Sequence, residues 1–127
     1  KILLTGCAGF IGSHLAKRLL DLGLTVVGLD CLDETLYPAA LHREQLAPLL
    51  TRPRFQFVEG DILSAGLLAE LTKEASAVIH LAALAGVRPS LAQACRYMRC
   101  NVEGSHKKRC GEGCEDAHAC LPESDLT

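Results

Sequence analysis

Short apolar runs alternate with segments of helical periodicity from the start of the chain to about residue 104. Runs suited to strands lie at Ile2–Thr5, Thr25–Asp30, Arg54–Val58 and Ala77–Leu81. The first helical pattern runs from Ile11 through Leu15, Leu19 and Leu22 to a stop at Gly23. Three more are predicted: one over Ala39–Leu50, one capped by Ser64, and one from Leu91 onward. Strands separated by helices pair in parallel through right-handed crossovers. The pattern therefore predicts an α/β fold, a doubly wound parallel sheet in strand order 3-2-1-4.

This periodicity stops at Ser105. Residues 105–127 contain no Val, Ile, Phe, Tyr or Met, and they hold three of the seven cysteines. We expect a domain over residues 1–104 and a divergent tail over 105–127 that is disordered or loosely packed. His106, Cys110, Cys114 and His118 recur every four residues, so a zinc site is an alternative there, although Gly111 and Gly113 disfavour the helix it needs.

Composition narrows the class of protein. A length of 127 residues with 49% apolar content suits one domain, and the net charge of -2 gives no electrostatic reason to expect nucleic acid or an anionic membrane as a partner. No apolar stretch approaches the ~20 residues of a membrane span, and no signal peptide is evident. The chain opens on Lys1, so we expect that preceding residues are missing or processed. Cysteines scattered through α/β patterning predict free thiols and a cytoplasmic location.

Three glycines lie between the first strand and the first helix. Gly6, Gly9 and Gly12 have the spacing G-x-x-G-x-x-G, and Asp30 ends the second strand. A strand that turns directly into a helix aims unpaired N–H groups at one point, which suits a phosphate, while a carboxylate after the second strand binds a ribose 2′-hydroxyl and repels a 2′-phosphate. The pattern predicts a dinucleotide site that prefers NAD to NADP. The alternative is that the glycines only form a tight turn and Asp30 is a solvated strand end.

Two further stretches fit a dinucleotide site at the carboxyl ends of the strands. Asp61 follows the third strand, where a side chain can reach an adenine amino group, or it caps the next helix. The small residues of "HLAALAG" (80–86) leave room for a flat ligand, or they pack closely under a helix.

Five motifs carry a resemblance to a known family. "TGCAGFIGSHLAKRLL", "VVGLD", "FVEGDI", "VIHLAALAGVRPS" and "NVEG" occur in order over residues 1 to about 104. Together they resemble the extended short-chain dehydrogenases/reductases, the NAD-dependent epimerases and dehydratases of nucleotide sugars, which have a Rossmann-type fold. "AGVRPS" and "LDETLYPAALHREQL" look most similar to UDP-glucuronate 4-epimerases.

The resemblance implies transient oxidation at C4 of a nucleotide sugar by bound NAD+, in proteins that are often homodimers. The cofactor residues it implies are Gly6, Gly9, Phe10, Ile11 and Gly12 at the pyrophosphate, Asp30 at the ribose, Asp61 and Ile62 near adenine, Leu81, Ala82 and Ala83 along the cofactor, and Asn101 near the nicotinamide. It places Arg88 and Ser90 near the sugar nucleotide, and it gives the chain no metal site.

The sequence also departs from this family. The fifth strand, the catalytic Ser/Thr, the Tyr-x-x-x-Lys pair and the substrate domain do not occur, since Tyr37 is followed four residues on by Leu41 and Tyr97 by Asn101. We therefore expect the cofactor-binding part of an epimerase, with a Rossmann-type sheet truncated after about four strands, no catalytic residue and an exposed fourth strand. The alternative is a catalytically inactive NAD-binding module. A Tyr-x-x-x-Lys reading frame downstream in the gene favours the first, and a natural stop codon after Thr127 favours the second.

Overall fold

The structure, a computed structural model, describes residues 1–105. The expectations for the tail, including the alternative zinc ligands His106, Cys110, Cys114 and His118, lie outside the described residues, apart from Ser105 itself.

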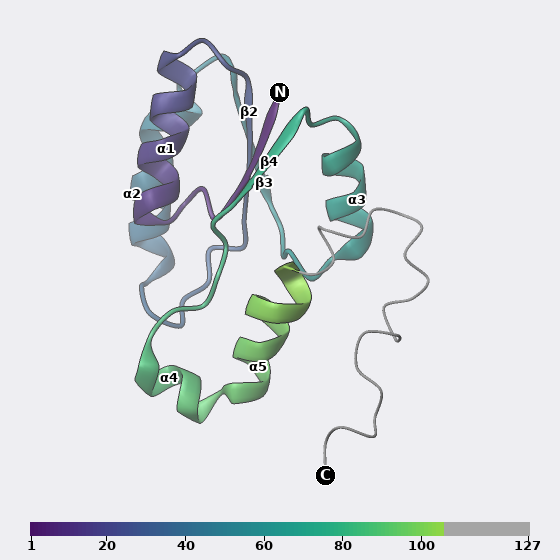
Figure 1. The fold of residues 1–127 in the computed structure, drawn as a ribbon. Coiled ribbons are helices and arrows are strands. Elements are labelled where there is room, and N and C mark those ends of the chain that lie inside the picture. The colour runs from purple at the N-terminus through teal and green to yellow at the C-terminus, as the bar shows by residue number, and fades with distance from the viewer. Residues whose placement is uncertain (106–127) are drawn as a thin grey trace.

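Four parallel strands form one sheet in the order β3-β2-β1-β4, which confirms the predicted topology. The strands are β1 (Ile2–Thr5), β2 (Val26–Asp30), β3 (Phe55–Glu59) and β4 (Ala77–His80). The helices are α1 (Phe10–Asp21), α2 (Ala39–Leu50), α3 (Ala65–Lys73), α4 (Val87–Ala92) and α5 (Ala94–Met98), and a π-helical turn, η1, spans Arg99–Glu103. Figure 1 shows α1 and α2 on one face of the sheet, α3 on the other, and α4 and α5 beyond the ends at which the strands finish.

The core divides into two layers because neighbouring strand residues point to opposite faces. Leu4 and Val26 pack toward α1 and α2, whereas Leu3 and Val27 belong to the cluster that includes Leu68 of α3. Leu3, Leu4 and Val26 are fully buried. The sheet is thus covered on both sides, as a doubly wound fold requires.

The buried face of α1 differs in part from the predicted one, because Leu15 and Leu19 pack against the core as expected but Ile11 and Leu22 do not. Ile11 and Leu22 are 68% and 60% exposed, while the helix buries Gly12, Ala16 and Leu20. The prediction rests on the largest apolar side chains, whereas small residues let the helix approach the sheet and so help to decide which face is buried.

Element boundaries differ slightly elsewhere. Ser64 is the N-cap of α3, as predicted, but its side chain makes no capping hydrogen bond. The helical region expected from Leu91 begins earlier, at Val87, because Gly86 turns the chain there with φ of +100°. Gly23 follows α1 with φ of +81°, which confirms it as the stop.

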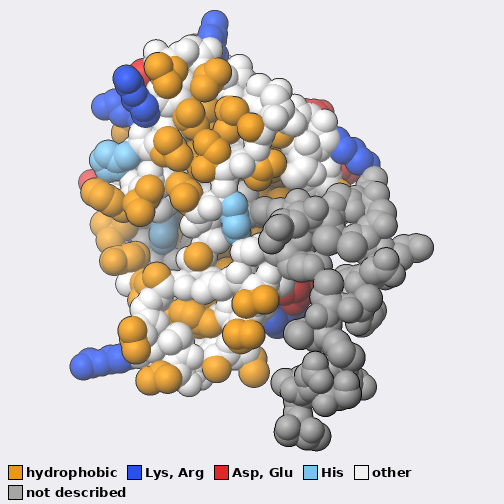
Figure 2. All heavy atoms as spheres, viewed as in Figure 1, with side chains coloured by type: hydrophobic (Ala, Val, Ile, Leu, Met, Phe, Trp, Pro, Cys, Tyr) orange, Lys and Arg blue, Asp and Glu red, His pale blue; other side chains and the backbone are white. Residues whose placement is uncertain are grey.

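Strand β4 lies at an edge of the sheet and pairs only with β1 among the described residues. Its Val78 side chain is 41% exposed. Figure 2 shows hydrophobic side chains on the face turned to the viewer, both over the sheet and over the region of α4 and α5. The expectation of an exposed fourth strand is confirmed for this part of the chain. No described helix is long and apolar enough to cross a membrane.

Candidate functional site

A cleft of about 660 Å³ opens where the strands end, between the β1–α1 turn, the β2–α2 loop, the segment after β4, and α5. The structure brings nine of the residues expected at a cofactor to its walls: Gly6, Gly9, Phe10, Asp30, Asp61, Ile62, Leu81, Ala82 and Ala83. Its volume lies in the usual range for small-molecule sites, about 300–1,000 Å³.

The β1–α1 turn can be built only with glycine at two positions. Gly6 has φ of +74°, and a Cβ there would lie 2.7 Å from the backbone nitrogen of Ala82. A Cβ on Gly12 would overlap the carbonyl oxygen of Gly6. Gly12 itself does not line the cleft, but its lack of a side chain lets α1 begin directly behind the turn.

The start of α1 faces the cleft without a side-chain cap. Gly9 is the N-cap residue and makes no side-chain capping hydrogen bond, and both Gly9 and Phe10 line the cleft. A Cβ on Gly9 would meet only the Gly6 carbonyl oxygen, at 3.4 Å. The positive end of the helix dipole and open space over the backbone suit a bound phosphate.

Asp30 fixes the turn from the end of β2. Its Oδ2 accepts a hydrogen bond from the backbone N–H of Ala8 at 2.9 Å, and its Oδ1 accepts one from Leu32 at 2.9 Å. Leu32 is buried with φ of +52°, a conformation that side chains rarely adopt. Asp30 is therefore an organised part of the cleft and not a solvated strand end. A carboxylate has about four acceptor sites, so it retains capacity for ligand hydroxyls.

Carboxylates gather at this end of the cleft. Burial and, after it, the nearby negative charges of Asp30, Asp61 and Asp33 together raise the pKa of the Cys31 thiol to about 11. Asp61 accepts a hydrogen bond from the N–H of Leu63 at 2.9 Å and is not the cap of α3, which is Ser64. Negative charge concentrated here favours ribose hydroxyls over another phosphate.

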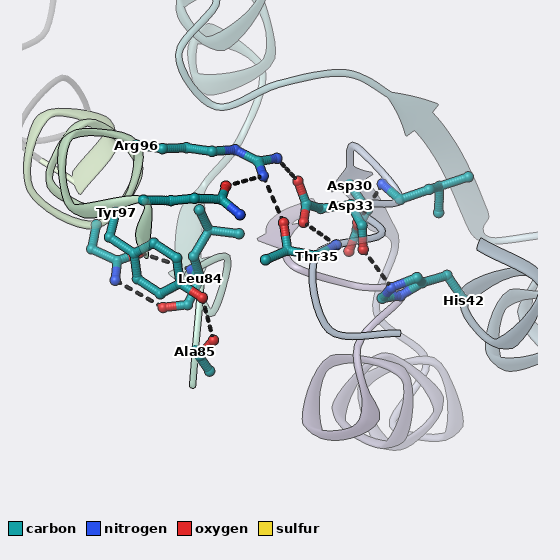
Figure 3. Close-up of polar contacts among 11 residues, drawn as sticks. Asp30, Asp33, Thr35, His42, Leu84, Ala85, Arg96 and Tyr97 are labelled. Carbon is teal, nitrogen blue, oxygen red and sulfur yellow. Dashed lines mark hydrogen bonds and ion pairs between the residues drawn. The ribbon is translucent and has the colours of Figure 1, made fainter. Parts of the chain in front are cut away.

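The opposite wall is held by α5 and η1. The Tyr97 hydroxyl donates to the carbonyl oxygen of Ala85 at 2.6 Å (Figure 3). The Asn101 side chain bonds to both backbone groups of Leu84, accepting from its N–H at 2.8 Å and donating to its carbonyl at 2.9 Å. Asn101 does not line the cleft; it supports Leu84, which does. Tyr97 was not predicted for this place, and its sequence neighbours contain no signal for the contact.

Five of the residues expected at the cofactor or the sugar nucleotide do not line the cleft: Ile11, Gly12, Arg88, Ser90 and Asn101. Arg88 and Ser90 are on α4, where Ser90 Oγ donates to the carbonyl of Val87 at 2.7 Å. No group of His, Cys, Asp or Glu side chains suited to a metal ion occurs within residues 1–105.

A family model described as GDP-mannose 4,6 dehydratase matches residues 3–107. The chain belongs to the GDP-mannose 4,6-dehydratase family. The resemblance to epimerases and dehydratases of nucleotide sugars is thereby confirmed.

Relatives of this chain include UDP-glucuronate 4-epimerases from a plant and a bacterium. UDP-glucuronate 4-epimerase 4 of Arabidopsis thaliana is 41% identical over 105 residues, covering 81% of this chain and 24% of the relative. A probable UDP-glucuronate 4-epimerase of Rhizobium meliloti is 42% identical over 108 residues, covering 83% and 31%. The chain thus spans between a quarter and a third of the length of these relatives.

Solved structures agree on the fold. UDP-glucuronic acid 4-epimerase from Bacillus cereus, in complex with UDP-glucuronic acid and NAD, has a TM-score of 0.77 at 38% identity, covering 84% of this chain and 34% of that one. The dTDP-glucose 4,6-dehydratase from Streptomyces venezuelae, solved with NAD, has a TM-score of 0.74 at 38% identity, covering 85% and 34%. The fold of this family member is therefore Rossmann-type.

Proposed function

We propose that residues 1–104 are the NAD-binding part of a nucleotide-sugar epimerase or dehydratase of the UDP-glucuronate 4-epimerase type. One observation carries the proposal: the glycine turn, the uncapped start of α1 and the Asp30 carboxylate converge on a single cleft. Phosphate-binding and ribose-binding groups at the carboxyl edge of a parallel sheet are the arrangement that recognises a dinucleotide.

The residues present fit NAD. The backbone at Gly9 is open to a pyrophosphate, because a Cβ there would have only one neighbour, and Asp30 has free acceptor capacity for the adenosine ribose. Asp61 and Ile62 flank the space for adenine, and the short side chains of Ala82 and Ala83 leave the wall beyond β4 open along the cofactor. When bound, NAD+ supplies the acceptor for a hydride from the sugar.

The choice of sugar rests on the relatives. The B. cereus epimerase is solved with UDP-glucuronic acid, and UDP-glucuronate 4-epimerases recur among the curated relatives. We assign Arg88 and Ser90 to the sugar-nucleotide side and Asn101 to the nicotinamide side, Asn101 acting through the Leu84 backbone that it holds.

The second candidate is a catalytically inactive NAD-binding module. The Tyr97 hydroxyl donates a hydrogen bond to the carbonyl oxygen of Ala85, and the residue as a whole is only 8% exposed, so Tyr97 is not placed as a general base. No tyrosine in the 127 residues has a lysine four positions on. General-base assistance is typically worth ~100- to 10,000-fold, so we expect no measurable epimerisation by the 127-residue polypeptide.

Titration calorimetry of the 127-residue chain with NAD+ and NADP+ tests the proposal. We expect NAD+ to bind more tightly than NADP+, and Asp30→Ala to weaken NAD+ binding and reduce the discrimination. Asp21→Ala is the matched control, because Asp21 is a surface carboxylate paired with Arg52 at 2.8 Å. Equal binding of the two dinucleotides contradicts the role of Asp30. Conversion of UDP-glucuronate to UDP-galacturonate, resolved by chromatography, separates an active enzyme from an inactive module.

Assembly and location complete the proposal. Val87 and Leu91 on α4, and Met98 and Val102 on α5 and η1, are each more than half exposed. This surface supports the homodimer that the resemblance implies, which sedimentation of the purified chain tests. The four described cysteines, Cys7, Cys31, Cys95 and Cys100, are free thiols, which supports a cytoplasmic location.

A further inference from the structure

Arg96 of α5 crosses from one wall of the cleft to the other. Its guanidinium forms an ion pair with Asp33 and donates a hydrogen bond to Thr35 Oγ1 at 2.6 Å, both on the β2–α2 loop. Figure 3 shows the Arg96 side chain extended from α5 toward these two residues. All of the contacting groups line the same cleft. We call this contact, made by Arg96, Asp33 and Thr35, the clasp.

The clasp joins two segments that are otherwise distant in sequence. Arg96 is 63 residues from Asp33 and also donates to Gln93 Oε1 at 3.0 Å, which anchors the guanidinium on its own side. A second contact runs parallel to it, because a Cβ on Gly86 would lie 2.9 Å from the Leu36 side chain. The loop from Cys31 to Leu36 is thus held against the α4–α5 wall.

Asp33 is prepared to accept the arginine. Its Oδ1 accepts a hydrogen bond from the N–H of Thr35 at 2.8 Å, and its side chain is 23% exposed. Burial alone would raise the pKa of Asp33, but the hydrogen bonds from Thr35 and the charge and hydrogen bond of Arg96 outweigh it and lower the pKa. The carboxylate is therefore ionised near neutral pH, and the pair is charged on both sides.

The loop that the clasp holds is the one that orients Asp30. The Asp30 carboxylate accepts the N–H of Leu32 within this loop, and Leu32 is held there in a left-handed conformation that a free loop seldom adopts. Displacement of the loop would release that bond and leave the Asp30 carboxylate held only by the N–H of Ala8, so its orientation toward the cleft would be less well fixed.

We infer that Arg96 is a positioning residue for the dinucleotide: through Asp33 and Thr35 it holds the β2–α2 loop in the shape that aims Asp30 at the adenosine ribose. The inference rests on the proposed function, because it presupposes that the cleft binds a dinucleotide. Arg96 acts through the loop and needs no contact with the ligand.

A double-mutant cycle tests this role. We measure binding of ADP-ribose by calorimetry, since this probe carries the adenosine ribose without the nicotinamide, for Arg96→Ala, Asp33→Asn and the double variant. Each single variant should weaken binding by roughly threefold to thirtyfold, as expected for loss of a charged hydrogen-bonded pair. The double variant should bind no more weakly than the weaker single variant. Arg96→Lys, which keeps the charge but not the forked donor, should recover part of the loss.

Two control variants separate the clasp from general charge effects. Arg52→Ala removes an ion pair of similar exposure, to Asp21, away from the cleft and should leave binding unchanged. Arg99→Ala removes a positive charge from the cleft but leaves the clasp, because Arg99 pairs with Glu103 on η1. Additive losses in the cycle, or an equal loss in Arg99→Ala, overturn the inference.

Hydrogen exchange without ligand gives an independent readout. Arg96→Ala should speed amide exchange in residues 31–37 and leave β1 unchanged, whereas Arg52→Ala should do neither. Unchanged exchange in residues 31–37 overturns the inference, as does faster exchange with unaltered ADP-ribose binding. If the unmodified chain binds neither ADP-ribose nor NAD+, the proposed function fails and the positioning role fails with it, while the exchange result still shows whether the clasp exists.

Discussion

The glycine turn allows stability and ligand binding to be separated by three single-methyl substitutions. Gly6→Ala places a Cβ 2.7–2.9 Å from backbone atoms of Leu81 and Ala82 and forces alanine to φ of +74°. The left-handed conformation costs about 1–2 kcal/mol. The overlap is with backbone that cannot rotate away, and overpacking of this kind costs about 1–3 kcal/mol more. We therefore expect Gly6→Ala to lower the free energy of unfolding by about 2–5 kcal/mol, a large part of the 5–15 kcal/mol that holds a typical domain.

Gly9→Ala should behave differently. Gly9 has φ of -75° and ψ of 167°, which any residue adopts, and its added Cβ would meet only one atom, at 3.4 Å. The change in stability should stay below about 1 kcal/mol, the usual scale for altering an N-cap. The methyl group would stand where a pyrophosphate approaches, and one misplaced carbon in a site is worth about tenfold or more in affinity.

Gly66→Ala is the matched control for both. No atom lies within 4 Å of its added Cβ, and it belongs to α3, so alanine should raise stability by up to about 1 kcal/mol without affecting the cleft.

Urea unfolding followed by far-ultraviolet circular dichroism measures these differences. With a slope of about 1–3 kcal/mol per molar urea, a loss of about 2–5 kcal/mol should lower the Gly6→Ala midpoint by roughly 0.7–5 M. Calorimetry with NAD+ then compares Gly9→Ala with the unmodified chain. A Gly6→Ala midpoint equal to that of the unmodified chain would refute the close approach of the turn to the end of β4. Unaltered NAD+ affinity in Gly9→Ala would refute the assignment of the pyrophosphate to this turn.

Three shorter predictions concern other groups. Asn101→Ala should lower the free energy of unfolding by about 1–3 kcal/mol in urea titrations, because it leaves two backbone groups without their partner. Alkylation at pH 8, read by peptide mass spectrometry, should label Cys31 slowly and leave Cys7 unlabelled until urea is added, because burial and the Asp30 charge raise the pKa of Cys7 to about 12. Labelling of Cys31 should accelerate with pH and slow when NAD+ is bound. The pKa of Asp33 is lowered in the folded state, so its contribution to stability is present above the unfolded pKa of about 3.9 and is lost as pH falls through the folded pKa. The difference in urea midpoint between the unmodified chain and Arg96→Ala should therefore shrink on acidification.

Local chemistry explains which parts of this fold and site the sequence predicts. The strand order follows from alternation of elements, and Gly6 is recognisable because the turn behind a strand requires a backbone that only glycine adopts easily. Asp30 is predictable for a similar reason, since its role depends on its place at the end of a strand.

Features that depend on contacts between distant segments were not predictable. Arg96 and Asp33 form an ion pair only because α5 folds back over the β2–α2 loop. In the sequence, nothing distinguishes these two charged residues from other solvated charges. The buried face of α1 is predicted only in part for a related reason: Leu15 and Leu19 pack against the core, but the closeness of helix and sheet is set by Gly12 and Ala16, whose small size carries no hydrophobic signal.

The position of Gly6 against the backbone at the end of β4 has a consequence for the edge of the sheet. The nearest atoms to its missing Cβ belong to Leu81 and Ala82, directly after the strand whose outer side has no neighbour among residues 1–105. Movement of β4 must therefore alter the shape of the turn. Thermodynamic reciprocity then applies: the factor by which a segment paired with β4 changes ligand affinity at the turn equals the factor by which the bound ligand changes the affinity of β4 for that segment. Pairing at the free edge of β4 and ligand binding in the cleft are therefore thermodynamically coupled.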